Sequence, residues 1–139
     1  MRTLTYGLFI ALLITWVACK DDDDNTPVFE YHAHIYQPDE SNKQMGDTIP
    51  IHLEFESHTG EIVHQINVQI FNATTHAVVY DQPLDSHVNS PVSYEFEDSI
   101  ILSAANGFSE GDWVIQAKVW GETDGEQEEV ESVNFHIHK

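Results

Sequence analysis

Apolar and polar residues alternate with a period of two along most of this chain. The alternation begins near residue 28, and no stretch repeats its apolar residues at helical spacing. A period of two places one side of a segment against a core and the other in solvent, which is typical of β-strands. The pattern predicts seven strands, over residues 29–35, 49–55, 64–70 and 77–80, around 94–96, and over 113–120 and 130–139.

Turn-forming residues separate these segments. Gly, Asn, Asp and Thr cluster at residues 45–47, 59–60, 72–75 and 124–125, and a longer loop is expected over 82–91. Residues 104–107 are expected to form one helical turn. Seven short strands separated by turns favour a two-sheet sandwich over a barrel. The predicted fold class is therefore all-β.

The inward side of each strand predicts the core. The bulkiest residues on that side, which we expect to be buried, are Leu53, Phe55, Trp113, Ile115, Phe135 and Ile137. His64 falls on the inward phase of the third strand, so we expect its side chain to be partly buried.

The last two predicted strands carry a family resemblance. The sequence Gly111-Asp112-Trp113-Val114-Ile115, the 124–125 turn and the segment 133–137 resemble the final hairpin of bacterial Ig-like, PKD-like domains. The resemblance implies that residues 28–139 form a seven-stranded Ig-like β-sandwich. Such domains serve adhesion, spacing and ligand binding, so the fold does not specify the function.

The start of the chain has the features of an export signal. Arg2 precedes an apolar run over residues 4–17, which is too short for a stable transmembrane helix. The single cysteine, Cys19, follows this run and resembles the acylated cysteine of a bacterial lipoprotein, although Trp16 stands where that family usually has Leu. The resemblance implies that residues 1–18 are a lipoprotein signal peptide. Cys19 is then the lipid anchor in the membrane.

An acidic segment follows the cysteine. The sequence Lys20-Asp21-Asp22-Asp23-Asp24-Asn25 resembles the export signal of Bacteroidota-type surface lipoproteins, which implies attachment to the outer membrane at the cell surface. A plain solvated spacer is the alternative, so residues 19–27 are interpreted as an acylated cysteine and acidic tether. Thr48 and Ser99 lie in triplets that resemble O-glycosylation acceptors of that phylum.

Charge excludes one class of partner. The chain has 24 acidic residues against 5 basic ones, and its formal net charge is −19. A nucleic-acid-binding surface needs clustered cations, so no nucleic acid is expected as a partner. Binding to anionic lipid through a basic patch is excluded for the same reason.

Nine histidines provide the candidate chemistry. His32 and His34 are two residues apart on the outward side of the first strand, and His136 and His138 repeat this arrangement on the last strand. His52 is also expected to face outward, on the same side of its strand as Glu54 and Glu56. The remaining histidines in turns and loops are interpreted as solvated: His58, His76 and His87.

The two His-x-His pairs suggest a metal site. If the first strand crosses over to run beside the last, the pairs become neighbours about 5 Å apart on one sheet. Four imidazoles at that spacing suit Cu(II) or Zn(II), and Glu30 or Glu54 could supply a carboxylate. The arrangement is similar to periplasmic copper-resistance proteins of the CopC type. The Met-rich stretches of that family are missing here, so the identity of the metal, copper or zinc, is left undecided by the sequence.

Two functions follow from these patterns. In the first, an envelope-anchored lipoprotein binds a divalent metal, copper or zinc, through the outward histidines. In the second, the chain is a non-catalytic structural, adhesion or accessory Ig-like module that binds a protein or glycan partner. No enzyme is expected, because the chain has no motif of a known nucleophile, metalloprotease or phosphate loop. Glu95 and Glu97 share an outward strand face and are interpreted as solvated acidic surface.

Overall fold

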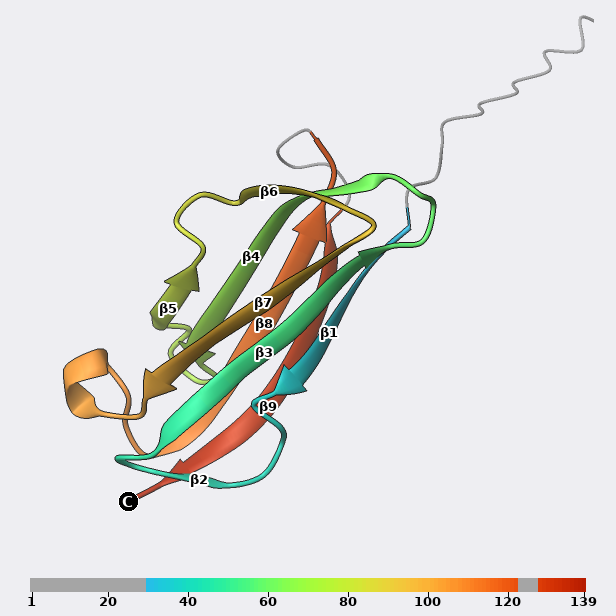
Figure 1. The fold of residues 1–139 in the computed structure, drawn as a ribbon. Helices are drawn as coiled ribbons and strands as arrows, with labels where there is room; N and C mark the ends of the chain where they lie inside the picture. The colour runs from blue at the N-terminus through green and yellow to red at the C-terminus, as the bar shows by residue number, and fades with distance from the viewer. Residues whose placement is uncertain (1–29, 123–127) are drawn as a thin grey trace, which may run out of the picture.

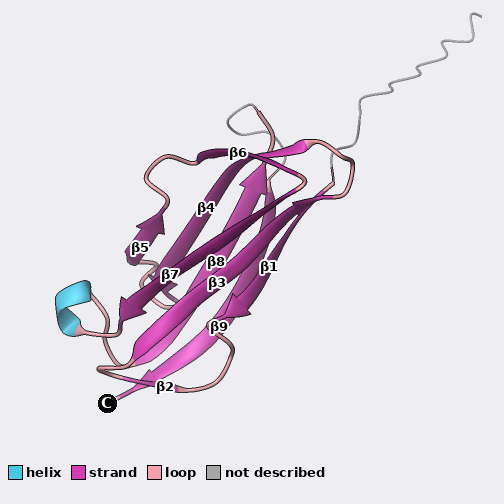
Figure 2. Cartoon of the chain, viewed as in Figure 1, coloured by secondary structure: helices cyan, strands magenta, loops and turns pink. Residues whose placement is uncertain are grey.

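The computed structural model describes residues 30–122 and 128–139, and its regular structure is almost entirely strand (Figures 1 and 2). The elements, in chain order, are β1 (Tyr31–Gln37), β2 (Lys43–Gln44), β3 (Thr48–Ser57), β4 (Ile62–Asn72), β5 (Val78–Gln82), β6 (His87–Pro91), β7 (Ser93–Ile101), the 3-10 helix η1 (Ala104–Asn106), β8 (Gly111–Trp120) and β9 (Glu129–His138). The prediction of an all-β protein is confirmed. No helix in the described ranges is long and apolar enough to cross a membrane.

Two sheets pack face to face. The smaller has three strands in the order β1-β3-β7, and the larger has six, in the order β2-β9-β8-β4-β5 with β6 also paired to β4. Figure 1 shows β3 and β7 lying across β4 and β8. Every pairing is antiparallel except that of β2 with β9. The architecture is the predicted Ig-like sandwich, with β2 and β6 as short strands beyond the predicted seven.

The core lies between the sheets. All the bulky side chains that the alternation predicts to be buried are buried: Leu53, Phe55, Trp113, Ile115, Phe135 and Ile137. The indole Nε1 of Trp113 donates a hydrogen bond to the carbonyl oxygen of Ser109 (2.9 Å), so the one polar atom of this side chain is satisfied. The period-two pattern is therefore a reliable guide to the faces of these strands.

A hydrogen bond ties the two sheets together near their edges. The Tyr80 hydroxyl on β5 donates to Asp98 Oδ2 on β7 (2.6 Å). Burial raises the pKa of Tyr80, and the hydrogen bond to Asp98 adds to the rise, so the phenol stays protonated and keeps donating.

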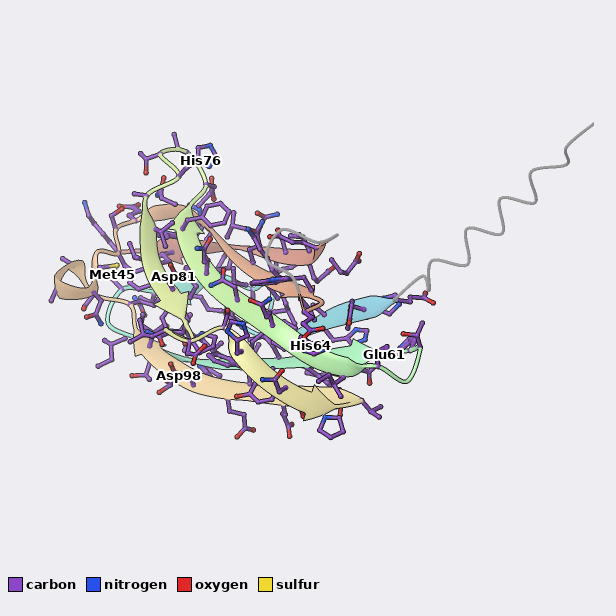
Figure 3. All side chains as sticks on the ribbon, turned by 90° about the horizontal axis from the view of Figure 1, so that it is seen from above. Met45, Glu61, His64, His76, Asp81 and Asp98 are labelled. Atoms are coloured by element: carbon purple, nitrogen blue, oxygen red, sulfur yellow. The ribbon has the colours of Figure 1, made fainter. Side chains whose placement is uncertain are left out.

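His64 is partly buried, as predicted, but the inward position predicted for it on β4 is wrong. Val63 and Gln65 are buried, and the next residue, Ile66, is buried as well, so the inward phase of β4 changes by one residue. The pairing of β4 with β6 shifts register between Val63 and Gln65, which is the behaviour of a β-bulge. His64 therefore lies on the outward side of β4, where Figure 3 labels it. Its Nδ1 lies 3.1 Å from Asn89 Oδ1.

The expected helical turn is present as η1. Ser103 is its N-cap, whose hydroxyl oxygen accepts a hydrogen bond from the Asn106 backbone N–H, and Gly107 ends it with a φ of 87°. A Cβ at Gly107 would lie 2.8 Å from the Val79 side chain, so both the backbone angle and the close approach require glycine here. The predictions for the signal, Cys19, the tether and the 124–125 turn fall outside the described residues.

Candidate metal-binding face

The two His-x-His pairs lie in different sheets, so the four-imidazole site predicted from the sequence is wrong. His32 and His34 are on β1 of the three-stranded sheet, and His136 and His138 are on β9 of the six-stranded sheet. Outward side chains of two packed sheets point in opposite directions. The histidine pairs therefore cannot share one ion.

The crossover that the prediction needed does exist, but it comes too late in the chain. β1 pairs with β3 throughout, and only β2, at Lys43 and Gln44, runs parallel to β9. Lys43 is paired there with Ile137. His34 precedes this crossing by nine positions, and so it stays with the smaller sheet.

The outward side of the three-stranded sheet gathers a different set of side chains. Register places His32 opposite Glu56, His34 opposite Glu54, and Glu54 opposite Glu95 on the third strand. We call this surface the His/Glu face, and it consists of Glu30, His32, His34, Tyr36, His52, Glu54, Glu56, His58, Glu95 and Glu97.

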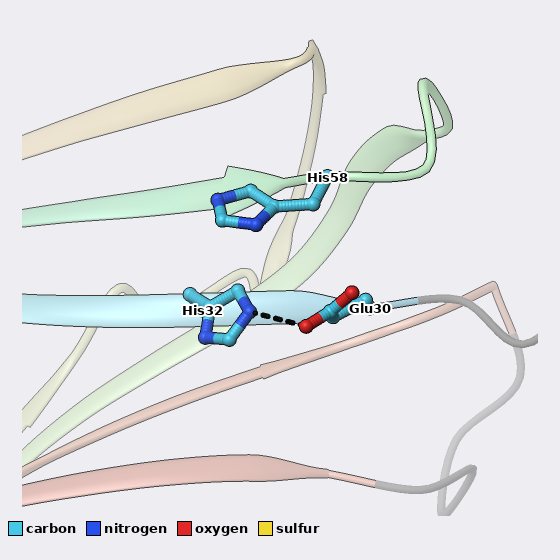
Figure 4. Close-up of side chains that lie close together, drawn as sticks. All are labelled: Glu30, His32 and His58. Atoms are coloured by element: carbon cyan, nitrogen blue, oxygen red, sulfur yellow. Dashed lines mark hydrogen bonds and ion pairs between the residues drawn. The ribbon is translucent and has the colours of Figure 1, made fainter.

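One end of the His/Glu face holds a cluster of two histidines and a carboxylate (Figure 4). The backbone N–H of His58 donates to the Glu30 carbonyl (2.9 Å), which continues the β1–β3 pairing and holds both residues in place. His32 Nε2 donates to Glu30 Oε1 (3.1 Å), and the His32 and His58 ring centroids are 4.4 Å apart. One potential ligand atom from each residue lies within 4.8 Å of the others. This group is called the His32 cluster.

A second cluster lies farther along the same face. His52 Nε2 donates to Glu95 Oε1 (2.9 Å), and Glu97 stands directly opposite His52 in the strand register. The potential ligand atoms of these three residues also lie within 4.8 Å of one another. This group is called the His52 cluster.

Aromatic and imidazole rings connect the two clusters. Centroid distances are 6.4 Å from His32 to His34, 6.4 Å from His34 to Tyr36 and 5.0 Å from Tyr36 to His52. His34 itself belongs to neither cluster, and its Nε2 lies 3.6 Å from Glu56 Oε2.

The His/Glu face has no ammonium group to balance its five carboxylates. The lysines that the structure describes pair elsewhere: Lys43 with Asp39, Lys118 with Glu128 (3.7 Å) and Lys139 with Glu110 (3.6 Å). In the described part of the sheet, these carboxylates contact imidazoles and the Tyr36 hydroxyl rather than ammonium groups. Hydrogen bonding from His58, with the nearby His34 adding to it, lowers the pKa of Glu56, so this carboxylate stays ionised.

The histidines on the larger sheet make a smaller group. His136 Nδ1 donates to Asp112 Oδ1 (2.6 Å), and its ring centroid lies 4.5 Å from that of His138. Within the described ranges, no third ligand group joins them at metal-binding distance. His76 and His87 are exposed, as predicted, and Figure 3 shows His76 in the turn between β4 and β5.

Sequence reasoning missed three members of the clusters. His58 was predicted to be a solvated turn residue; it is exposed, but it also contacts His32 across the strand pair. Glu95 and Glu97 were interpreted as acidic surface. Their spacing of two residues on an outward strand was the available signal, but only the pairing of β3 with β7 brings them to His52.

No protein-family model matches the chain, and no curated protein matches it. Among solved structures, the chain is similar to a CARDB domain from Pyrococcus furiosus, whose crystal structure is "in complex with di-metal ions"; the TM-score is 0.52 at 10% identity, covering 78% of this chain and 93% of that one. The solution structure of the same domain gives a TM-score of 0.54 at 13% identity, covering 78% and 94%. Identities this low show the fold alone.

Proposed function

We propose that this chain is a non-catalytic binding protein that holds a divalent transition metal, Zn(II) or Cu(II), on its His/Glu face. The His32 cluster is the site. The observation that carries the proposal is the convergence of Glu30, His32 and His58, whose potential ligand atoms lie within 4.8 Å of one another.

The donor set of the His32 cluster matches the metal. Two imidazoles and one carboxylate form a set that binds zinc in many proteins, and imidazole nitrogen also suits copper. Tetrahedral zinc with bonds near 2.0–2.1 Å needs ligand atoms about 3.3 Å apart. The His32 Nε2 to Glu30 Oε1 distance is already 3.1 Å, so small rotations of exposed side chains complete the geometry.

Electrostatics favours a cation at this position. Glu56 contacts His58 through a 3.1 Å hydrogen bond, so its ionised carboxylate can orient that imidazole toward an ion. A divalent cation also offsets the repulsion among carboxylates that no described lysine approaches. The di-metal complex of the similar Pyrococcus furiosus domain is a precedent for a metal on this type of sandwich.

The proposal also places the domain at the cell envelope. The sequence at residues 1–27 supports a lipid anchor at Cys19 and an acidic tether, with the sandwich held outside the outer membrane. There the domain would capture or buffer metal ions. A structural or accessory module that binds an envelope protein or glycan is the function that would remain if no metal binds.

Calorimetric titration of the 26–139 fragment with Zn(II) and Cu(II) tests the site. The fragment contains the whole core, whose residues run from Tyr31 to Ile137. We expect Zn(II) to raise its melting temperature by linkage. His58→Ala should weaken Zn(II) binding at least tenfold, because it removes one of three ligands.

The matched control is His76→Ala, which removes an exposed histidine in the turn between β4 and β5, two strands of the other sheet. It should bind Zn(II) as the unchanged fragment does. A melting temperature that neither Zn(II) nor Cu(II) shifts, or equal affinities for the His58 and His76 variants, would reject the His32 cluster as the metal site.

A further inference from the structure

We propose that the His52 cluster is a second, separate metal site that takes a harder divalent cation of the Mn(II) type. His52, Glu95 and Glu97 are its protein ligands. The inference shares the His/Glu face with the proposed function but rests on its own three residues.

Strand pairing fixes the geometry of this second site. Glu95 and Glu97 are alternate residues of β7, so both side chains leave the sheet on the same side. His52 on β3 lies opposite Glu97 in register and donates to Glu95 Oε1 at 2.9 Å. The imidazole therefore stands between two carboxylates, with a potential ligand atom from each residue inside a 4.8 Å limit.

Tyr36 limits the ligand set to three side chains. Its hydroxyl donates a hydrogen bond to Glu54 Oε2 (2.9 Å), which engages that carboxylate. Glu54 is opposite Glu95 in the strand register, so this hydrogen bond engages the carboxylate beside the cluster. The Tyr36 ring also lies against His52, with centroids 5.0 Å apart, which restricts the orientation of that imidazole.

The carboxylates of the His52 cluster have no lysine partner in the described residues, which favours a bound cation. The Glu97 carboxylate has no hydrogen bond or ion pair within residues 30–122 and 128–139, and the described lysines pair with other carboxylates. Glu95 and Glu97 are both exposed, so water molecules can complete the coordination of an ion placed between them.

The donor atoms distinguish the two sites. Carboxylate oxygen and water suit Mn(II), whereas a higher share of imidazole nitrogen favours Zn(II) and Cu(II). The His52 cluster supplies two carboxylates and one imidazole, and the His32 cluster supplies the reverse. We therefore infer that Mn(II) binds at His52 and that the His32 cluster contributes little to its affinity.

Mn(II) titration followed by electron paramagnetic resonance tests this site, because the sharp signal of aqueous Mn(II) decreases when the ion is bound. The 26–139 fragment should bind one Mn(II) ion. Glu97→Gln should weaken that binding at least tenfold, since the neutral amide is a poorer ligand. Glu110→Gln is the matched control, because it removes one exposed carboxylate away from the His/Glu face and should leave Mn(II) affinity unchanged.

His58→Ala separates this inference from the proposed function. The variant should keep Mn(II) binding while it loses Zn(II) affinity. If His58→Ala loses Zn(II) affinity and keeps its Mn(II) affinity, both sites are supported. If the fragment binds Mn(II) and His58→Ala leaves Zn(II) affinity unchanged, only the second site is supported. Equal Mn(II) affinity in the Glu97 and Glu110 variants, or equal losses in the Glu97 and His58 variants, would overturn the inference. Unchanged melting of each metal-free variant verifies its fold.

Discussion

Gln65 is a polar side chain that the fold buries completely. Its amide Nε2 donates to the carbonyl oxygens of Gly121 (3.1 Å) and Glu122 (3.3 Å), and its Oε1 accepts from the Ser86 hydroxyl (3.1 Å). One side chain thus satisfies backbone groups at the end of β8 and a residue in the loop before β6. Burial without these bonds would be costly, because an unpaired polar group loses its hydration.

Replacing Gln65 by Leu should therefore destabilise the domain by about 1–3 kcal/mol. The Leu side chain fits an apolar environment but leaves the two carbonyl oxygens and the Ser86 hydroxyl without their partner. Urea unfolding of the 26–139 fragment measures the change. Gln69→Leu, at a half-buried position of the same strand, is the control and should change stability by less; a Gln65 variant as stable as this control would contradict the assignment.

At the scale of elements, the segment between β1 and β3 carries the chain from the small sheet to the large one. Asp39 accepts hydrogen bonds from the Lys43 ammonium and from the hydroxyl and backbone N–H of Ser41. These contacts close the turn that precedes β2. They lower the pKa of Asp39 to about 2, with the Lys43 hydrogen bond as the largest cause.

Lys43→Met should raise the pKa of Asp39 toward its ordinary value near 3.8, since only the bonds from Ser41 remain. Carboxylate chemical shifts in an NMR pH titration report this value directly. A lowered pKa stabilises the folded state above the ordinary value, and the contribution disappears as pH falls toward 2. The variant should accordingly lose less stability than the unchanged fragment between pH 4 and pH 2. A pKa that does not move would show that Lys43 does not contact Asp39 in solution.

At the scale of the whole molecule, the proposed lipid anchor at Cys19 would hold the proposed metal-binding face at the cell envelope. We expect Cys19→Ser to release the protein from the membrane fraction or to leave it as an unprocessed precursor, because the chain has no other cysteine to acylate. Fractionation of cells that express the full chain measures this change. Cys19→Ser protein that still sediments with membranes after correct processing would end the lipoprotein interpretation.

The local pattern of this sequence determined which side of each long strand is buried. Leu53, Phe55, Trp113 and Phe135 follow a period of two, and side-chain direction in a strand depends only on position along it. The exception is β4, where one bulge reverses the phase at Gln65 and Ile66 and moves His64 to the outer side. A bulge depends on the neighbouring strand, so the alternation did not reveal it.

Only the tertiary structure decided which histidines and carboxylates meet. His58 reaches His32, and Glu97 reaches His52, because β3 pairs with β1 on one side and with β7 on the other. The alternation correctly predicted that both His-x-His pairs face outward, but the prediction that the two pairs are neighbours is wrong. The crossover to β9 occurs at Lys43, after both histidines of β1. Strand pairing joins residues that are distant in the chain, and the alternation within each strand is the same whichever partner lies beside it.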